Sequence, residues 1–474
     1  MVTVTYNSLG VIDHNGELVG DSITLDDGVV MGFSRTGYSK VVEVDGYILP
    51  GFIDAHLHVK GLGVFLQSVN LRGVTSREEL VRLMSSSKME VVVGRGWDQE
   101  AFPDKKPPSR RDLDRAVPDR PAVAIRICGH MAVANSRALE ETKPWMRYPE
   151  YVDRENGVLY EDAVYYTVNS LLAKLDEASM VWASLGELRA NGIAGVSSMA
   201  CSSGEIEALR RLDLEKGLPV KVACYASHDS FEEYKGVSTK NFTVVGVKLF
   251  ADGSLGARTA YLKEPYNDDP GTRGKMLLSS RDIKRIAGEA LNSGFRVAIH
   301  AIGDAALDEV LEAYEELNPG GRARIEHASV SWPGQIRRMA ELGVAVVVQP
   351  SFRKSDWWLD RRLGARAERA YRFREMLSSG VFLAASTDAP VEDYRPWETF
   401  RVAMGNCGDH RCRYGEDLSP RDVIRMYTVN AARASGSPLD SLGRIERGLR
   451  AYIAYTTSYP LSSSWRGPLK PLNF

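Results

Sequence analysis

The chain has 474 residues, of which 44% are hydrophobic and 26% charged, as is typical of a globular protein with more than one domain. Its 60 basic and 62 acidic residues give a net charge of −2, which provides no positive field for nucleic acid or an anionic membrane. The first residues do not resemble a signal peptide, and no run approaches the ~18 apolar residues of a membrane-spanning helix. We therefore expect a cytoplasmic protein that binds neither nucleic acid nor membranes.

Residues 1–50 read as short strands, separated by turn residues at Asn15-Gly16 and Asp27-Gly28. From residue 51 apolar strands alternate with helical stretches such as 280–294 and 304–317, which is the pattern of a parallel sheet. The eight predicted strands read FIDAHLH (52–58), GIAGVSSMA (192–200), VKVACYASHD (220–229), TVVGVKLFADG (243–253), FRVAIHAIGD (295–304), ARIEHAS (323–329), VAVVVQPS (344–351) and VFLAASTDAP (381–390). Eight such repeats predict an α/β fold, a TIM (β/α)8 barrel, with active-site residues at the carboxyl ends of the strands.

The connection between the first two strands is too long for an ordinary loop. It contains strand-like stretches of its own at 89–102 and 120–139, so we expect an inserted lid subdomain over 59–190 within a barrel domain of 51–435. After residue 435 the chain returns to turns and short strands. We expect residues 1–50 and 436–474 to form one small β-sandwich domain from both chain ends.

The five cysteines, Cys128, Cys201, Cys224, Cys407 and Cys412, are scattered and odd in number, so reduced thiols are the simpler interpretation. The segment CGDHRC at 407–412 is either a small zinc knuckle or a plain polar loop. Because it lacks a second set of ligands elsewhere in the sequence, we favour the loop.

Histidines gather at the carboxyl ends of the predicted strands. His56 and His58 stand two residues apart, so in a strand both side chains point the same way and can converge on a metal. His300 and His327 end two other strands, and Asp388 ends the last one. Any one of these residues alone is more simply a structural residue, but together at one end of a barrel they indicate a metal site.

Lys248 lies inside an apolar strand, where an unpaired ammonium group is costly to bury. Pairing with an acid such as Asp252 is one solution. The other is a neutral amine that reacts with carbon dioxide to form a carbamate, which is an anionic oxygen ligand able to bridge two cations.

Several segments together resemble the amidohydrolase superfamily, and within it the amidohydrolase-3 group of formamide deformylase-like proteins. They are PGFIDAHLH, VKLFADGSLGARTAYLKEPYNDDPGTRG, AIHAIGDAALDEVLEAY, RIEHAS and ASTDAPV in the barrel, and GRGWDQEAFP, GHMAVANSRAL and GVLYEDA in the insertion. The resemblance runs from about residue 45 to 450. The chain departs from the family pattern at Tyr452, which stands where relatives carry an acidic residue in the last β domain.

The resemblance implies two divalent metal ions, zinc first, with iron, manganese or cobalt as alternatives. His56, His58 and Asp388 would hold one ion and His300 and His327 the second, with a carboxylated Lys248 between them. Asp388 would also be the catalytic base, and His130 would bind substrate, stabilise charge or serve only as a structural residue of the insertion. Trp97, Asp98, Glu161 and Asp252 are further candidate substrate contacts, although Asp252 is more simply a residue that orders its loop.

The function that follows is hydrolysis of a non-peptide carbon-nitrogen bond, in an amide, formamide or cyclic amide, by a metal-activated hydroxide. The same site also suits an ester, lactone or phosphoester, and a non-catalytic binding protein on this fold is a third alternative. A serine nucleophile is disfavoured, because the segment DGSLG lacks the glycine two residues before Ser254 that a nucleophile elbow needs. We expect a small-molecule substrate and a homodimer.

Overall fold

The fold was analysed in a computed structural model that describes residues 3–34, 40–126, 131–173, 175–462, 465 and 467–472. The chain divides into two compact units. The first comprises Met1–Leu62 and Val181–Phe474, and the second comprises Gly63–Met180. The second unit lies within the predicted insertion, so one domain is interrupted by another.

Eight parallel strands form the predicted barrel in the first unit. In order around the sheet they are β6 (Phe52–Leu57), β13 (Ile193–Cys201), β14 (Lys221–Ser227), β15 (Phe242–Phe250), β16 (Arg296–Ala301), β17 (Ala323–His327), β18 (Ala345–Val348) and β19 (Phe382–Ala385). The last strand meets the first just beyond its carboxyl end, where Asp388 N donates to His56 O and His58 N donates to Ala389 O, both at 2.8 Å. The α/β barrel predicted from the sequence is confirmed, strand by strand.

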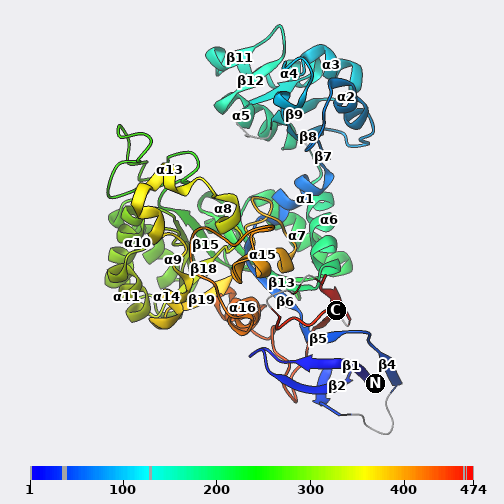
Figure 1. The fold of residues 1–474 in the computed structure, drawn as a ribbon, viewed down its shortest axis with the longest axis vertical. Coiled ribbons are helices and arrows are strands. Elements are labelled where there is room, and N and C mark those ends of the chain that lie inside the picture. The colour runs from blue at the N-terminus through cyan, green and yellow to red at the C-terminus, as the bar shows by residue number, and fades with distance from the viewer. Residues whose placement is uncertain are drawn as a thin grey trace. The chain divides into compact units, whose positions relative to one another are not determined.

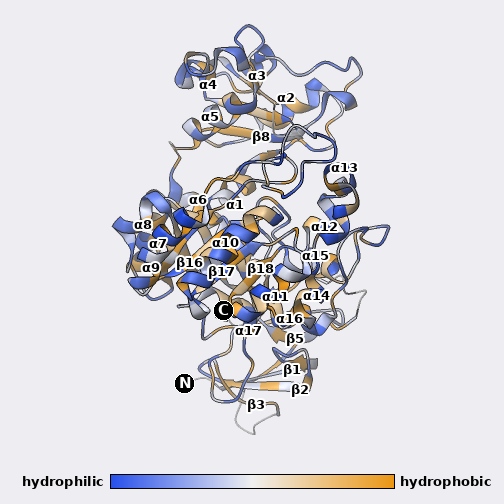
Figure 2. Ribbon diagram, turned by 90° about the vertical axis from the view of Figure 1, so that its left-hand side faces the viewer, coloured by the Kyte–Doolittle hydropathy of each residue, from blue (hydrophilic) through white to orange (hydrophobic). Residues whose placement is uncertain are grey.

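Side chains that point into the barrel fill it with small and branched apolar groups, such as Ala223, Ala298 and Val347, together with the ring of Tyr225. Helices cover the outside of the strands, as Figure 1 shows for α9, α10 and α11, and the strands are coloured as the more hydrophobic layer in Figure 2. Helix α9 begins at a capping box in which Ser279 and Asp282 satisfy each other's backbone N–H groups. The helices of this unit are α6 (Glu177–Ala190, which begins in the second unit), α7 (Ser203–Lys216), α8 (His228–Tyr234), α9 (Ser280–Asn292), α10 (Asp304–Leu317), α11 (Pro333–Leu342), α12 (Phe352–Ser355), α13 (Leu359–Leu363), α14 (Phe373–Ser378), α15 (Pro396–Ala403), α16 (Pro420–Tyr427) and α17 (Val429–Ser435), with the 3-10 turns η4 (Gly320–Arg322) and η5 (Gly364–Arg369).

Both ends of the chain contribute to one small sheet, as predicted. Its central path pairs C-terminal strands with N-terminal ones, and the register joins Ile453 to Pro50 and Thr456 to Tyr47 in antiparallel fashion. A core of Val11, Ile23, Ile48 and Ile453 is buried beneath it. Its strands are β1 (Thr3–Ile12), β2 (Leu18–Asp26), β3 (Val29–Gly32), β4 (Lys40–Glu43), β5 (Tyr47–Pro50), β20 (Ile453–Thr456) and β21 (Lys470–Pro471).

The second unit has a six-stranded sheet and a hydrophobic core of its own. Trp97, Phe102 and Leu113 are buried in this core. Its elements, with α1 shared at the boundary, are α1 (Val59–Gln67), β7 (Val69–Asn70), α2 (Arg77–Ser85), β8 (Val92–Trp97), η1 (Gln99–Ala101), α3 (Arg110–Ala116), β9 (Ala122–Arg126), β10 (Met131–Ala134), α4 (Ser136–Thr142), η2 (Pro144–Met146), η3 (Pro149–Tyr151), β11 (Val152–Asp153), β12 (Val158–Tyr160) and α5 (Glu161–Leu172).

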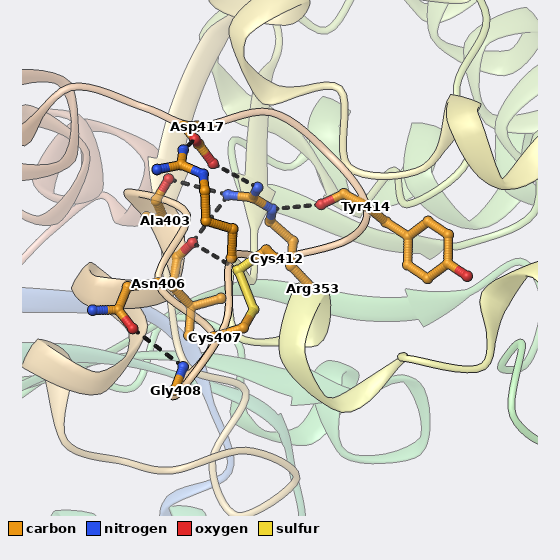
Figure 3. Close-up of a disulfide and its surroundings, with 10 residues drawn as sticks. Arg353, Ala403, Asn406, Cys407, Gly408, Cys412, Tyr414 and Asp417 are labelled. Atoms are coloured by element: carbon orange, nitrogen blue, oxygen red, sulfur yellow. Dashed lines mark hydrogen bonds and ion pairs between the residues drawn. A yellow bond between two sulfur atoms is a disulfide. The ribbon is translucent and has the colours of Figure 1, made fainter.

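The interpretation of all cysteines as reduced thiols is wrong for one pair, because Cys407 and Cys412 form a disulfide that closes the CGDHRC loop. Figure 3 shows the loop beside the buried guanidinium of Arg353, which donates to the carbonyls of Ala403 and Tyr414 and to Asp417. With both sulfur atoms joined to each other, the zinc knuckle has no thiolate ligands. Cys201 and Cys224 are free and buried, and Cys128 lies outside the described residues.

None of the helices in the described ranges is long and apolar enough to cross a membrane.

Candidate metal centre

Six side chains singled out in the sequence come together at the carboxyl end of the barrel. His56, His58, Lys248, His300, His327 and Asp388 all line one cavity of about 340 Å³. They come from β6 and the residue that follows it, from β15, β16 and β17, and from the loop after β19. The topology explains the convergence, because the carboxyl ends of all parallel strands meet at one face of the barrel.

Two of these residues have a left-handed backbone, one at the last residue of its strand and the other in the loop that follows its strand. His327 has φ 73° and Asp388 has φ 58°, in the left-handed region where a non-glycine residue costs about 1–3 kcal/mol. Glu326 points into the barrel, so in a regular strand His327 would point outward. The left-handed turn allows both neighbours to face inward, and strain of this kind is typical of functional sites.

Each histidine is oriented by an acceptor on the ring nitrogen that faces away from the cavity. In His56 the Nδ1 atom lies 2.5 Å from Glu326 Oε2. In His58 it lies 3.1 Å from Met199 O, and in His327 it lies 2.6 Å from Gln349 Oε1. His300 is turned the other way, with Nε2 donating to Gly253 O at 2.9 Å. Because a carbonyl or carboxylate can only accept, the remaining nitrogen of each neutral ring carries a lone pair, as a metal ligand requires.

Asp388 provides the test of whether these residues fit a cation. Its Oδ1 atom is buried without a hydrogen-bond partner among the described residues, although His56 Nε2 and His58 Nε2 each lie 3.3 Å from it. When both rings are neutral, with Nδ1 donating to its acceptor, both Nε2 atoms face this oxygen with lone pairs, and three electron-rich atoms converge. A cation at their centre removes this conflict. The group of described residues whose ligand atoms all lie within 4.8 Å of one another is His56, His327 and Asp388, which has His327 in place of His58.

The electrostatics of the cavity keep these ligands in the state that a metal needs. Burial lowers the pKa of His300 to about 3 and that of His327 well below its ordinary value, so both rings are neutral. Burial acts to raise the pKa of Asp388, but positive charge at His56 and hydrogen bonds from His56 and His58 outweigh it and hold that pKa well below the usual range, as a bound cation also would. Neutral imidazoles and an ionised carboxylate are the metal-binding forms.

Lys248 is almost fully buried, and burial lowers the pKa of its amine to about 8. Its Nζ makes no hydrogen bond or ion pair with the described residues, and it lies 5.0 Å from the centre of the Phe250 ring. The expected alternative, an ion pair with Asp252, is therefore absent from the described part of the chain.

Asp252 has a different role from the substrate contact we considered. It is buried, and its carboxylate accepts the backbone N–H groups of Tyr261, Ile302 and Gly303 at 2.8 to 3.0 Å. These bonds hold the loop after β15 against the turn after β16. Asp252 Oδ1 also lies 3.5 Å from His300 Nε2, so it supports a site residue from behind.

Sequence reasoning missed a buried pair beneath the site, Arg324 and Glu326. Both side chains are fully buried, and Arg324 donates to both oxygens of Glu326 and to Ala55 O. Glu326 in turn accepts from His56 Nδ1. The signal was present in RIEHAS, where two charges stand two residues apart in an apolar strand and so face the same interior.

The candidate residues of the insertion lie within the second unit. Trp97 is fully buried in its core, and its indole N–H donates to Ala124 O, so its environment is that of a core residue and not of a pocket wall. Asp98 forms an ion pair with Arg126 at 2.8 Å and caps η1. Glu161 is exposed at the first residue of α5. His130 lies outside the described residues.

Beyond the candidate ligands, the cavity wall is mostly apolar and aromatic. Phe250, Leu255, Ile302, Phe352, Trp358 and Val391 supply this surface, and Ser254, Ser329, Asp356 and Tyr371 supply polar groups. The residues from 352 to 371 follow the seventh strand, and their spacing shows no periodicity that would mark them as a pocket wall.

Comparisons with known proteins agree with this geometry. Residues 45–458 match the model of the amidohydrolase family. The chain is 29% identical over 460 residues to a putative amidohydrolase, YtcJ, of Bacillus subtilis (87% of this chain and 86% of the relative), and 25% identical over 480 residues to an N-substituted formamide deformylase of Arthrobacter pascens (92% and 88%). Among solved structures, an uncharacterized metal-dependent hydrolase of Pyrococcus furiosus is 31% identical with a TM-score of 0.87, covering 97% of this chain and 100% of that one.

Proposed function

Because the chain belongs to the amidohydrolase family, whose members are metal-dependent hydrolases, we propose that it hydrolyses a non-peptide carbon-nitrogen bond in an amide, formamide or cyclic amide. The observation that carries this proposal is the unpartnered Oδ1 atom of Asp388 between two histidine nitrogens. The formamide deformylase relative supports the choice of bond.

In this proposal His56, His58 and Asp388 would hold one divalent ion, and His300 and His327 would hold a second. Lys248, carboxylated on Nζ, would be a further oxygen ligand. Its burial, and the absence of a partner for its amine in the described ranges, support the carbamate. Histidine and oxygen ligands favour zinc, and they also suit iron, manganese or cobalt. When bound, such ions lower the pKa of water and polarise a carbonyl oxygen.

The protein's own groups then carry the proton and place the substrate. Asp388 is ionised, so its carboxylate accepts the proton released as water attacks the carbonyl carbon. The same carboxylate then passes that proton to the leaving nitrogen, which departs as a neutral amine. The apolar wall of Phe352, Trp358 and Leu255 surrounds the substrate and excludes bulk water.

The test is a panel of N-formyl and N-acyl amines measured beside esters and lactones of the same shape, with metal-reconstituted protein. We expect amide turnover that a chelator removes and added zinc restores. Asp388→Asn should reduce turnover by at least about a thousandfold while circular dichroism stays unchanged, because the variant cannot accept the proton. Turnover of esters alone would replace the proposal with the esterase alternative, and full activity of Asp388→Asn would remove the role of this residue.

We also propose that the protein is cytoplasmic and forms a homodimer, as most soluble oligomers do. Light scattering of the purified chain tests the dimer directly, and a monomeric mass would contradict it.

A further inference from the structure

One carboxylate on the cavity wall, Asp356, is not accounted for by the metal centre. It ends α12 and lines the cavity together with Phe352, Trp358 and Tyr371. Its Oδ2 atom accepts a hydrogen bond from the hydroxyl of Tyr371. Tyr371 is itself buried and has φ 55°, so the backbone holds a strained residue at the place where its ring reaches this carboxylate.

Asp356 forms no ion pair with the described residues. Two arginines of the same segment are paired elsewhere, because Arg353 binds Asp417 and Arg362 binds Asp268. A second carboxylate, Glu392, is close enough to interact with it electrostatically: burial, with a further contribution from Asp356, raises the pKa of Glu392 to about 7. Lys354 acts on Glu392 in the opposite direction, but no ion pair joins it to Asp356 in the described part of the chain, so Asp356 keeps no cationic partner.

Aromatic rings complete the surroundings of this carboxylate. Phe352 and Trp358 line the same cavity, and ring faces attract cations in addition to giving apolar contact. A carboxylate beside aromatic faces in a partly desolvated cavity is the chemistry that recognises an organic ammonium ion. A neutral or anionic group at this position would leave the carboxylate without a counter-charge.

We propose that Asp356, held in place by Tyr371, is a specificity-determining residue that binds a primary ammonium group on the substrate, on the side of the molecule away from the reacting bond. The inference rests on the proposed function for the reacting end, and it assigns the substrate class as amides that also carry an alkylammonium arm, such as N-acylated diamines. Within that class Asp356 selects the substrate and takes no part in bond cleavage.

Binding of two small probes tests this recognition without any turnover. Benzylammonium and benzyl alcohol have the same shape and differ in charge. Their binding is measured by calorimetry at about pH 8, where the amine is protonated. Asp356 is ionised at this pH, since burial raises the pKa of its carboxyl only to about 6. We expect benzylammonium to bind the wild-type protein at least about tenfold more tightly than the alcohol, both with and without a chelator. Equal affinities for the two probes overturn the proposal. A preference that the chelator abolishes also overturns it, because the amine would then be binding to a metal ion and not to Asp356.

Asp356→Asn should remove the tenfold preference and leave the affinity for benzyl alcohol unchanged. Asp360→Asn, which changes a partly exposed carboxylate paired with Arg413, is the matched control and should keep the preference. A preference that survives in folded Asp356→Asn overturns the assignment, and the wild-type comparison decides the matter if this variant does not fold. If no amide is cleaved but the preference holds, the proposed function fails while the ammonium site stands.

Discussion

At the scale of single residues, the metal centre depends on a buried glutamate that makes no contact with the cavity. Glu326 accepts from His56 Nδ1 and is itself held by Arg324. Burial acts to raise the pKa of Glu326, but the charge of Arg324 outweighs it and holds that pKa well below its usual range. Glu326 therefore remains an anion that fixes the tautomer of His56 and increases the basicity of its other nitrogen.

Glu326→Gln should lower the affinity for divalent metal by about 10- to 100-fold, because the amide keeps the hydrogen bond but loses the charge. Competition with a coloured chelator measures this affinity. Glu316→Gln, which removes half of an exposed ion pair with Lys284, is the control and should bind metal as the wild type does.

Because Glu326→Gln also leaves Arg324 buried without its counter-charge, it should unfold more easily by a few kcal/mol, and the affinity must be measured on folded protein. Glu326→Asp keeps the charge and serves as the second variant. An unchanged metal affinity in folded Glu326→Gln would show that the pair acts on the barrel core alone.

At the scale of elements, the turns between strands and helices are held by single buried carboxylates. Asp213 lies near the end of α7, and both of its carboxylate oxygens accept hydrogen bonds. One oxygen accepts from Leu218 N and from the side-chain amide of Asn241. The other accepts from the hydroxyl of Thr239 and from Asn241 N. Asp213 ties the turn before β14 to the turn before β15. Burial acts to raise its pKa, but the bonds from Thr239 and Asn241 more than offset this effect and lower that pKa.

Asp213→Asn should therefore destabilise the barrel unit by roughly 1–3 kcal/mol at neutral pH, measured by urea unfolding. A depressed carboxyl pKa stabilises the folded state above the unfolded pKa of about 3.9, and this contribution disappears as the pH falls through the folded value. The difference between wild type and variant should thus shrink below about pH 4. Asp229→Asn, at a fully exposed side chain, is the control, and a difference that does not change with pH would contradict the assignment.

The barrel strands could be predicted from the sequence because each is a short apolar run with turn residues on both sides. His56 and His58 were recognisable for the same reason, since a two-residue spacing in a strand fixes their common direction. The inward orientation of His327 beside Glu326 could not be predicted, because it requires a left-handed residue that the period of a strand does not encode. The wall residues Asp356 and Tyr371 were missed because they lie in short irregular segments, where only the tertiary fold brings them together.

At the scale of the whole molecule, the chain consists of a discontinuous unit and a continuous one. The continuous unit, residues 63–180, has its own sheet and two hydrophobic clusters, one of them centred on Trp97 and Phe102. A continuous segment with a closed core needs no contact from the rest of the chain to bury its apolar surface.

Residues 63–180 expressed alone should accordingly fold, with a cooperative thermal transition and the ordered near-ultraviolet dichroism of a buried tryptophan. Trp97→Ala should abolish the transition, because it empties the centre of that core at a cost of about 3–5 kcal/mol. A wild-type fragment that stays unfolded would show that this core depends on the barrel unit.

Histidines at the ends of three strands, together with Lys248 and Asp388, should form a metal centre, and the direct test is the metal content per chain. Elemental analysis is made on protein purified without chelator and in the presence of bicarbonate, beside His56→Ala and the exposed-loop control His410→Ala. We expect about two equivalents of transition metal for the wild type and for His410→Ala, and a clear loss for His56→Ala. Wild-type protein that holds no metal even after reconstitution would contradict it.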